Sequence, residues 1–443
     1  MSRLSGFPEW LPAQRAVEQR VIDLLRETFE LHGFAGLETR AVEPVEQLLR
    51  KGEIDKEVYA VRRLHADDDA ADSLALHFDL TVPFARYVVE NANDLEFPFR
   101  RYQIQKVWRG ERPQQGRFRE FTQADIDVVA RDVLPFHFDV EVARVMAEAL
   151  SRLPVPRLRL QVSNRKVLEG FYRGLGVAEP TAVMQAVDKL DKLPQDAVRS
   201  LLLQAGLDER QADACLALSA ISTSDSSFAE QVTALGVEHE LLAEGLAELV
   251  RVIDGCAGIE GVDVVVDLRI ARGLDYYTGT VFETRMAGYE HLGSVCSGGR
   301  YDELARDNRN TYPGVGISLG VSRILSPLFA DGLVADRSVP SVVLVAVHDE
   351  AERAASDALA TALRSRGIAT EVAPAAQRLG KQIRHAERRG IPYVLFPGDA
   401  VQVKDLRTGD QVDVDPTTWT PAPDDLRAGI VRPTPAPPEE TTP

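Results

Sequence analysis

The chain has 443 residues, of which 44% are hydrophobic and 27% are charged, a composition typical of a globular protein with a sizeable core in two or three domains. No apolar run approaches the ~20 residues that span a bilayer, and no secretory signal is visible at the start, so we predict a cytoplasmic protein without membrane partners. The net charge of −17 argues against a nonspecific nucleic-acid coat.

The first predicted elements are a helix and a series of strands. Apolar residues recur at helical spacing from Arg15 to His32. A strand from Phe34 to Val42 leads to Pro44. Short strand-like runs then dominate from Glu57 to Ala85, on either side of an acidic turn at residues 67–69 that we predict to be a hairpin tip.

A long hairpin follows. Phe99–Val107 and Phe118–Val129 are strand-like runs that flank a loop, residues 109–116, which carries charge instead of ordinary turn chemistry. Residues 100–119 hold seven Arg and Lys against Glu111 alone, a local charge of +6 in an acidic protein. Such an island predicts a place where a polyanion binds. A basic surface hairpin without function is the alternative.

The middle of the chain is predicted to contain an insertion. After a helix at Phe138–Leu150, the sequence becomes Ala- and Leu-rich and mostly helical, and strands resume at Val262. We therefore predict a helical insertion domain between two parts of one strand-rich domain. The expected boundaries are 1–158 and 262–332 for the strand-rich domain and 159–261 for the insertion.

The C-terminal part changes pattern. From Ser341 onward, strands and helices alternate, which indicates a small, mostly parallel α/β domain at 338–415. Within it, residues 378–389 hold five Arg and Lys against one Glu, and either a second polyanion site or a solvated helix face explains them equally well. The tail, 416–443, has eight prolines in 28 residues and is predicted to be disordered.

Cysteine usage gives no sign of a metal. Cys215, Cys256 and Cys296 are odd in number and about forty residues apart, which suits neither a disulfide framework nor a zinc site with paired ligands. We predict reduced thiols and no structural metal.

The hairpin carries the most informative chemistry. Arg109 and Glu111 are followed across the loop by Arg117 and Phe121, and on a hairpin these side chains can converge. Arginine offers a planar fork for phosphate oxygens, phenylalanine a face for a purine, and glutamate an acceptor for an exocyclic amine. The pattern predicts a nucleotide site that has no Gly-rich loop.

This hairpin pattern resembles motif 2 of the class II aminoacyl-tRNA synthetases, and Gly314–Arg323 resembles their motif 3. Arg272–Glu283 and Gly298–Asp302 are similar to the two histidine-specific segments of the histidyl enzymes. Phe34–Pro44 looks like motif 1, and Lys381–Pro392 is similar to the anticodon-binding domain. The resemblance covers nearly the whole chain.

The resemblance implies an α+β catalytic domain with an antiparallel six-stranded sheet, the class II synthetase fold, together with a helical insertion, a C-terminal α/β anticodon-binding domain and a homodimer. It implies ATP-dependent attachment of L-histidine to tRNA(His) through a histidyl-adenylate intermediate, with release of AMP and diphosphate. The expected partners are tRNA(His), L-histidine and ATP with Mg²⁺, and no DNA.

The resemblance also implies roles around ATP. Arg109 would clamp the α-phosphate, Glu111 would lie on the adenine side, and Phe121 would stack on adenine. Arg117 and Arg323 would meet the terminal phosphates. Arg272 would lie beside the α-phosphate and the histidine carboxylate, and it completes the implied catalytic set, Arg109, Arg272 and Arg323.

Histidine would be bound by a second implied set. Asp79, Thr81 and Gln123 would surround its amino group, and Asp127 with Tyr276 and Tyr277 would read its ring. Many bacterial members carry Glu where this chain has Asp79 and Asp127, so the side-chain reach differs here.

Two other functions compete with the ligase. A synthetase-like regulatory or sensor protein would keep the fold and lack aminoacylation, although the chain retains the histidine segments and the C-terminal domain that such proteins tend to lose. An RNA-binding module would use the basic islands and leave the segment Arg272–Glu283 unexplained.

Overall fold

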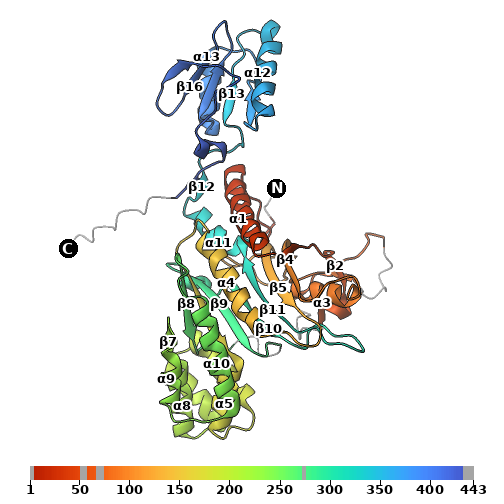
Figure 1. Ribbon diagram of the computed structural model, residues 1–443, viewed down its shortest axis with the longest axis vertical. Coiled ribbons are helices and arrows are strands. Elements are labelled where there is room, and N and C mark those ends of the chain that lie inside the picture. The colour runs from red at the N-terminus through yellow and green to blue at the C-terminus, as the bar shows by residue number, and fades with distance from the viewer. Residues whose placement is uncertain (1–3, 50–56, 66–73, 272–275, 433–443) are drawn as a thin grey trace, which may run out of the picture. The chain divides into compact units, whose positions relative to one another are not determined.

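A computed structural model describes residues 4–49, 57–65, 74–271 and 276–432. The chain divides into two compact units: Met1–Pro8 with Val21–Pro327, and Glu9–Arg20 with Leu328–Pro443. Each unit has its own sheet (Figure 1).

Helix α1 spans Pro12–Leu31 and confirms the helix predicted from Arg15 to His32. Its apolar side chains at helical spacing are buried, as the periodicity requires, with Val17, Leu25 and Phe29 completely covered. The helix ends before Gly33, which has a φ of +77° that few other residues adopt.

The first unit is built on a mixed sheet that has nine strands within the described residues, in the order β1-β4-β5-β11-β10-β9-β6-β8-β7. Their bounds are β1 Ala35–Gly36, β4 Phe99–Trp108, β5 Glu120–Val129, β11 Gly314–Gly320, β10 Cys296–Tyr301, β9 Thr280–Met286, β6 Leu158–Asn164, β8 Val262–Asp267 and β7 Ser222–Thr223.

The predicted six-stranded antiparallel sheet is the centre of this larger sheet. From β4 through β5, β11, β10 and β9 to β6, every neighbouring pair of strands is antiparallel. The predicted strand count is wrong for the whole because strands join at both edges: β1 pairs parallel with β4, and β8 pairs parallel with β6. A parallel neighbour needs a long crossover, and the helices between β6 and β8 supply it.

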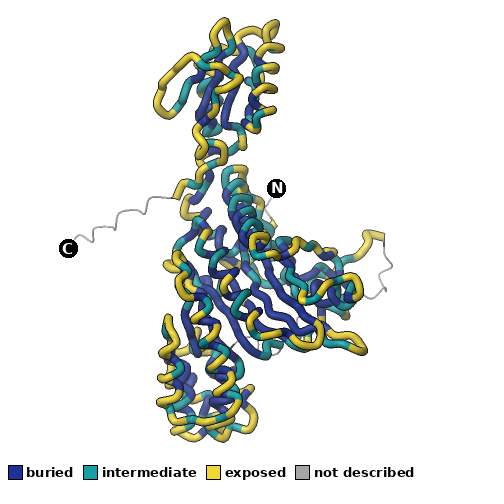
Figure 2. The backbone as a smooth tube through the Cα atoms, in the orientation of Figure 1, coloured by how far each residue is buried: buried dark blue, intermediate teal, exposed yellow. Residues whose placement is uncertain are grey.

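The two faces of the sheet differ in chemistry, as its alternation requires. On β5, Ala124, Ile126 and Val128 are buried on one face, and Gln123, Asp125 and Asp127 occupy the other. Helix α4, His137–Ser151, packs on the sheet with buried side chains that include Val142 and Met146. Figure 2 shows that the strands beside it are mostly buried.

The segment between α1 and β4 differs from its prediction. The predicted strand Phe34–Val42 is interrupted, leaving β1 and a separate strand β2, Val42–Pro44, which pairs with β3, Leu74–Leu76. Residues Val45–Leu48 form the short helix α2. The acidic turn at residues 67–69 lies outside the described residues.

Helix α3, Thr81–Glu90, replaces the strands predicted up to Ala85. The Asp79 carboxylate accepts a hydrogen bond from the backbone nitrogen of Val82 at 3.1 Å, which satisfies one of the free donors at the start of the helix. Phe84 and Val88, at helical spacing, are buried. This hydrogen bond and tertiary packing therefore override the strand-like composition.

The insertion is mainly helical, although the predicted range 159–261 begins within strand β6 of the main sheet. Its helices, several of which lie together in Figure 1, are α5 Arg165–Gly174, α6 Pro180–Val187, η3 Asp188–Asp191, α7 Gln195–Gln204, α8 Glu209–Ser219, α9 Phe228–Thr233 and α10 Glu240–Gly255. Helices α5 and α10 meet at glycines. A Cβ atom on Gly170 would lie 2.3 Å from the backbone nitrogen of Leu242.

Helix α11, Val321–Ala330, follows β11, and a short helical turn, η4, covers Glu290–Leu292.

In the second unit a sheet has the order β14-β13-β15-β16-β17. Its elements are β13 Val343–Val345, η5 Glu350–Glu352, α12 Arg353–Ser365, β14 Thr370–Val372, α13 Leu379–Arg389, β15 Tyr393–Phe396, β16 Gln402–Asp405 and β17 Gln411–Asp413.

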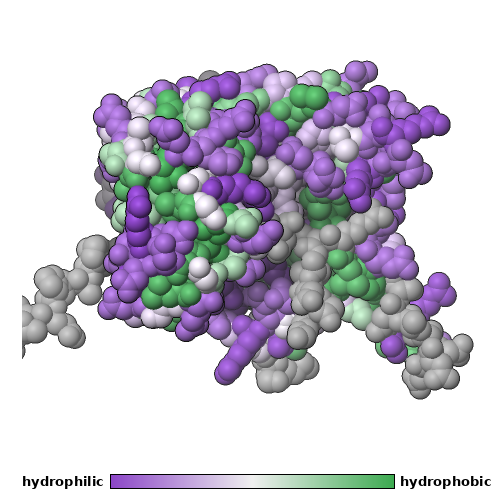
Figure 3. Space-filling model, turned by 90° about the horizontal axis from the view of Figure 1, so that it is seen from below, coloured by the Kyte–Doolittle hydropathy of each residue, from purple (hydrophilic) through white to green (hydrophobic). Residues whose placement is uncertain are grey.

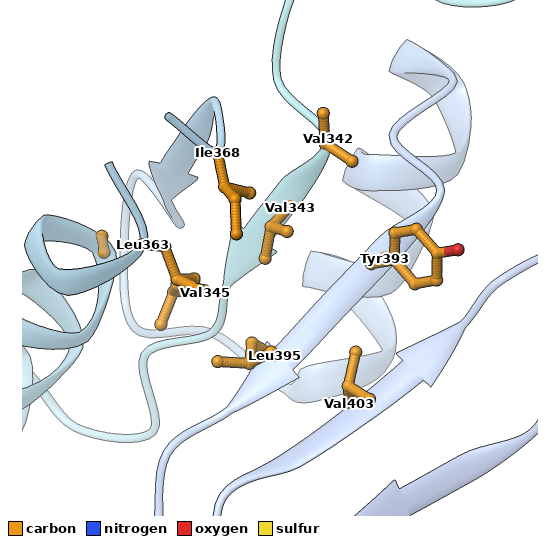
Figure 4. Close-up of a cluster of buried hydrophobic side chains, with 9 residues drawn as sticks. Val342, Val343, Val345, Leu363, Ile368, Tyr393, Leu395 and Val403 are labelled. Atoms are coloured by element: carbon orange, nitrogen blue, oxygen red, sulfur yellow. The ribbon is translucent and has the colours of Figure 1, made fainter. Parts of the chain in front are cut away.

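The predicted alternation of strands and helices from Ser341 is confirmed as far as β15. Strand β13 pairs parallel with β14 and β15, and Val343, Val345 and Leu395 lie in one buried cluster (Figure 4). The antiparallel strands β16 and β17 were not predicted, so the sheet is mixed.

Residues 416–432 have a defined structure, whereas the sequence predicts a disordered tail from residue 416. Trp419 packs edge-on against Tyr393, with ring centroids 5.5 Å apart, and the Tyr393 hydroxyl donates to Asp425 at 2.6 Å. A 3₁₀ turn, η6 at Pro423–Leu426, precedes β18, Ile430–Val431, which pairs with β12, Val334–Ala335. A few specific contacts thus order a proline-rich sequence. Residues 433–443 lie outside the described residues.

Among the described residues, no helix combines the length and the apolar character needed to cross a membrane. The face seen from below is covered largely by hydrophilic residues, with smaller hydrophobic patches between them (Figure 3).

The close approach of α5 and α10 can be tested by replacing Gly245 with alanine. The added Cβ would lie 2.6 Å from the backbone nitrogen of Val167, so the helices must separate, and we expect the free energy of unfolding to fall by about 1–3 kcal/mol. Urea unfolding followed by circular dichroism measures the change. The matched control is Gly380→Ala in α13, where the added Cβ meets no atom within 4 Å and stability should hold or rise slightly. Equal effects in both variants would contradict the tight helix contact.

Candidate active site

The polar face of the central strands forms the floor of the candidate site. The register aligns residues of β4, β5 and β11 in three rows. The rows are Arg101–Asp127–Gly316, Gln103–Asp125–Ser318 and Gln105–Gln123–Gly320. Because residues in one row point to the same side of a sheet, these side chains face a common space.

A cavity that we call the hairpin cavity lies at one end of this floor. It is lined by the following residues: Arg109, Glu111, Gly116, Arg117, Phe118, Phe121, Gln123, Ser294, Val295, Cys296, Ser297, Ser318, Gly320 and Arg323. Five of the six residues expected around ATP are therefore brought together, along with Gln123, and the sixth, Arg272, lies outside the described residues.

Contacts with neighbouring groups position the cationic side chains of the hairpin cavity. The Arg109 Nε donates to the carbonyl oxygen of Phe78 at 3.0 Å, and its guanidinium carbon lies 5.1 Å from the centre of the Phe121 ring. The Arg117 Nη1 lies 3.6 Å from the Glu111 Oε2, and this arginine side chain is 48% exposed. An exposed ion pair of this kind is weak, so incoming phosphates can replace the carboxylate at low cost.

Arg323 stands in the first turn of α11 and donates from Nη2 to the carbonyl oxygen of Leu292. Arg117, Arg323, Ser294 and Ser297 also line an adjoining space, which we call the tyrosine cavity. Its walls include Tyr276, Tyr277, Glu283, Arg285 and Lys192. The two cavities thus share a cationic boundary.

The two tyrosines expected to contact the histidine ring line the tyrosine cavity. Tyr276 and Tyr277 have ring centroids 4.1 Å apart. Burial raises the pKa of the Tyr277 phenol well above its ordinary value, and the same is true of Tyr301. Both therefore stay neutral and able to donate at physiological pH. A Cβ atom on Gly299 would lie 2.7 Å from the Tyr277 ring, so this glycine lets the ring approach the sheet.

Asp127 lies in the sheet floor and lines neither cavity. Its side chain is almost fully buried, its Oδ2 lies 2.7 Å from the Arg101 Nη2, and its Oδ1 accepts from the Tyr301 hydroxyl at 2.8 Å. A Cβ atom on Gly316 would come within 2.0 Å of that Oδ1. The glycine in this row therefore makes room for the carboxylate.

The residues expected at the amino group are only partly brought together. Gln123 lines the hairpin cavity and donates from Nε2 to the hydroxyl of Ser318 at 2.5 Å and to Asp125 at 3.1 Å. Asp79 and Thr81 lie at the start of α3 and line neither cavity. Asp79 is buried near Asp125, whose pKa is raised by burial and to a lesser degree by the Asp79 charge. Arg272 lies outside the described residues.

Sequence reasoning gave no individual role to three residues around Asp127: Arg101, Asp125 and Tyr301, the last of which lies within the histidine-specific segment Gly298–Asp302. Arg101 was counted in the basic island, yet its side chain is fully buried and paired with Asp127. The alternation of polar and apolar residues along β5 is the signal that could have placed Asp125 beside Asp127 on one face. Two other cations of the island are paired too, Arg100 with Glu141 and Lys106 with Glu120. The local charge of +6 therefore overstates the charge available to a polyanion.

In the part of the chain that the structure describes, no group of three or more His, Cys, Asp or Glu is placed to hold a metal ion.

Similarity to known proteins extends over both units. Residues 6–324 match the family model of histidyl-tRNA synthetase, and residues 341–418 match that of an anticodon binding domain. The chain is 58% identical to a histidine–tRNA ligase of Cutibacterium acnes and 55% identical to that of Micrococcus luteus, each over 97% of this chain and 98% of the relative. The crystal structure of histidyl-tRNA synthetase from Nostoc sp. PCC 7120 is similar with a TM-score of 0.84 and 34% identity, covering 94% of this chain and 96% of that one.

Proposed function

The chain belongs to the histidyl-tRNA synthetase family, and we propose that the hairpin and tyrosine cavities are the places where it joins ATP to histidine. The overall reaction is the ATP-dependent attachment of L-histidine to tRNA(His), with histidyl-adenylate as intermediate and AMP and diphosphate as products. The observation that carries the assignment of the cavities is that the residues implied for ATP line one of them and the tyrosine pair lines the other, with Arg117 and Arg323 on both.

The hairpin cavity takes ATP. Phe121 stacks on adenine, Glu111 accepts from its exocyclic amine, and Arg109 holds the α-phosphate, while Arg117 and Arg323 meet the terminal phosphates. The histidine carboxylate attacks the α-phosphorus and diphosphate leaves. Negative charge builds up on the oxygens of this phosphoryl group in the transition state. Guanidinium groups that are already in place stabilise this charge without reorganising. Mg²⁺ enters with ATP as the counter-ion of its phosphates.

The tyrosine cavity takes the histidine ring. Asp127 lies in the adjoining sheet floor, near enough for its charge to raise the pKa of Tyr277, and it accepts a hydrogen bond from one ring nitrogen. A neutral tyrosine of the Tyr276–Tyr277 pair contacts the other. An amino acid without these nitrogens would leave both protein groups unpaired and be rejected strongly. Asp79, Thr81 and Gln123 surround the amino group. Arg272, outside the described residues, is assigned beside the α-phosphate by the resemblance alone.

The basic island on α13 is proposed to contact tRNA(His) in the anticodon-binding domain. Arg378, Lys381, Arg384 and Arg388 are exposed on or beside this helix, so they can reach phosphates. We further propose that the protein works in the cytoplasm as a homodimer. A regulatory or sensor function finds no support in the similarity to histidine–tRNA ligases over nearly the full length.

Amino-acid-dependent ATP–diphosphate exchange tests the cavities directly. With Mg²⁺ present and each standard amino acid supplied separately, we expect exchange with histidine alone, because only its ring satisfies both Asp127 and the tyrosine pair. Exchange with several amino acids would remove the ring-reading role of these residues. No exchange from a folded protein that still binds histidine would revive the regulatory alternative.

Gly316→Ala tests the room left for Asp127. The added Cβ, 2.0 Å from the Asp127 Oδ1, must displace the carboxylate, so we expect kcat/KM for histidine in the exchange reaction to fall about a hundredfold or more. Gly380→Ala serves as the control, because its Cβ meets open space in the other unit. Full histidine activation by Gly316→Ala would show that the position of Asp127 is irrelevant.

A charge reversal on α13 tests tRNA binding. In the double variant Lys381→Glu and Arg384→Glu we expect the KM for tRNA(His) to rise on the order of tenfold, with a weaker salt dependence, because phosphate contacts are lost. Histidine-dependent exchange should be unchanged. Lys404→Glu, on strand β16 of the same domain, is the control. If aminoacylation keeps its wild-type KM for tRNA, α13 is only a solvated basic face.

A further inference from the structure

We propose that Arg101 is a positioning residue for histidine recognition: it holds the Asp127 carboxylate in a fixed orientation toward the imidazole ring. The inference rests on the proposed function of the tyrosine cavity, and it adds a residue to which no role had been given.

The sheet register brings the guanidinium to Asp127. Arg101 and Asp127 are directly opposite each other on β4 and β5, and the Arg101 Nη2 lies 2.7 Å from the Asp127 Oδ2. The Arg101 side chain is completely shielded from solvent, and Phe84 of α3 covers it, with the guanidinium carbon 4.3 Å from the ring centre. This burial leaves the arginine little freedom to leave the carboxylate.

Two further neighbours of Asp127 are Tyr301 and Gly316. The Tyr301 hydroxyl donates to the Oδ1 at 2.8 Å, and Gly316 follows Asp127 in the same row, with no side chain to compete for the space. One oxygen is therefore held by a cation and the other by a phenol. A carboxylate fixed in this way presents its acceptor directions at a set angle, which a ring N–H can match.

Two neighbouring carboxylates explain why a cation is needed in the row Arg101–Asp127–Gly316. Asp125 and Asp127 lie two residues apart on the same face of β5, and both are buried. Arg101 faces both, with its Nη2 3.9 Å from the Asp125 Oδ2. Without a guanidinium, two buried carboxylates would repel each other, and one would take up a proton. A protonated Asp127 would carry a donor O–H on one oxygen and would accept more weakly from a ring N–H.

Stability alone does not account for the arginine. Its Nε, Nη1 and Nη2 are buried and make no hydrogen bond among the described residues, so Nη2 meets Asp127 as an ion pair only. A buried guanidinium with unsatisfied donors is costly, and apolar residues often replace such pairs without loss of stability. The arginine is better explained by what it does to Asp127.

The shorter reach of aspartate fits this role. Where a glutamate could extend toward the ligand on its own, Asp127 is held close to the sheet and depends on neighbours for its direction. Arg101 lies behind it on the floor and touches no part of either cavity. Its effect on histidine is therefore indirect.

Arg101→Met tests the proposal, with Arg100→Met as the matched control. Arg100 is the adjacent residue on β4, is partly exposed and pairs with Glu141 at 2.8 Å, away from the floor. In ATP–diphosphate exchange we expect Arg101→Met to raise the KM for histidine about tenfold or more, while the KM for ATP stays within about twofold. Arg100→Met should leave both constants unchanged.

A second set of variants distinguishes the proposed effect from misfolding. Arg101→Met combined with Asp125→Asn removes one carboxylate together with the cation, so the buried net charge is preserved. Asp125→Asn alone is its control. Arg101→Lys keeps the charge and loses the planar fork, and it should raise the KM for histidine by an intermediate factor.

Two results would overturn the proposal. One is a wild-type KM for histidine in any folded variant that lacks Arg101. The other is a rise in the KM values for both histidine and ATP together with a fall in kcat, which would indicate a general structural role. Failure of the wild-type protein to exchange at all would instead reject the proposed function, so the two failures can be told apart.

Discussion

The constraint on which the site depends is the alternation of side chains across the six central antiparallel strands. The face of β5 and β11 that packs against α4 is apolar, which leaves the other face of these strands to carry polar groups. The register then decides which polar groups meet. A slip of one residue between β4 and β5 would turn Arg101 away from Asp127 and bring apolar side chains to the floor. Packing on one face thus fixes the chemistry on the other.

The cations of this acidic protein work in two different environments. Arg117 is half exposed and lightly paired with Glu111, so its charge is available to an incoming phosphate. Arg101 is buried and committed to a carboxylate of the floor. Both arginines contribute equally to the local charge of +6 in residues 100–119, although only Arg117 is exposed enough to meet a ligand directly. In the proposed roles, the environment, and not the residue type, separates a binding arginine from a positioning one.

Much of this could be predicted from the sequence because local patterns determine it. Helical periodicity gave α1 and α4, and the charged loop between two strand-like runs gave the hairpin with Arg109, Glu111 and Phe121. The family resemblance supplied Tyr276 and Tyr277. What could not be predicted depends on contacts between distant residues: the pairing of Arg101 with Asp127, the α3 helix covering that pair, and the packing of Trp419 that orders part of the proline-rich tail. Composition gives no information about such partners.

The proposed division, with ATP at the hairpin and histidine at the sheet, suits the two substrates. ATP is large and highly charged, so arginines at a loop and at a helix start can hold it through strong, tolerant contacts. Histidine is small, and its recognition depends on a few hydrogen bonds whose angles must be correct. Groups on a paired strand, such as Asp127, are positioned more exactly than groups on a loop because backbone hydrogen bonds hold them on both sides. Rigidity is therefore greatest where discrimination between amino acids requires it.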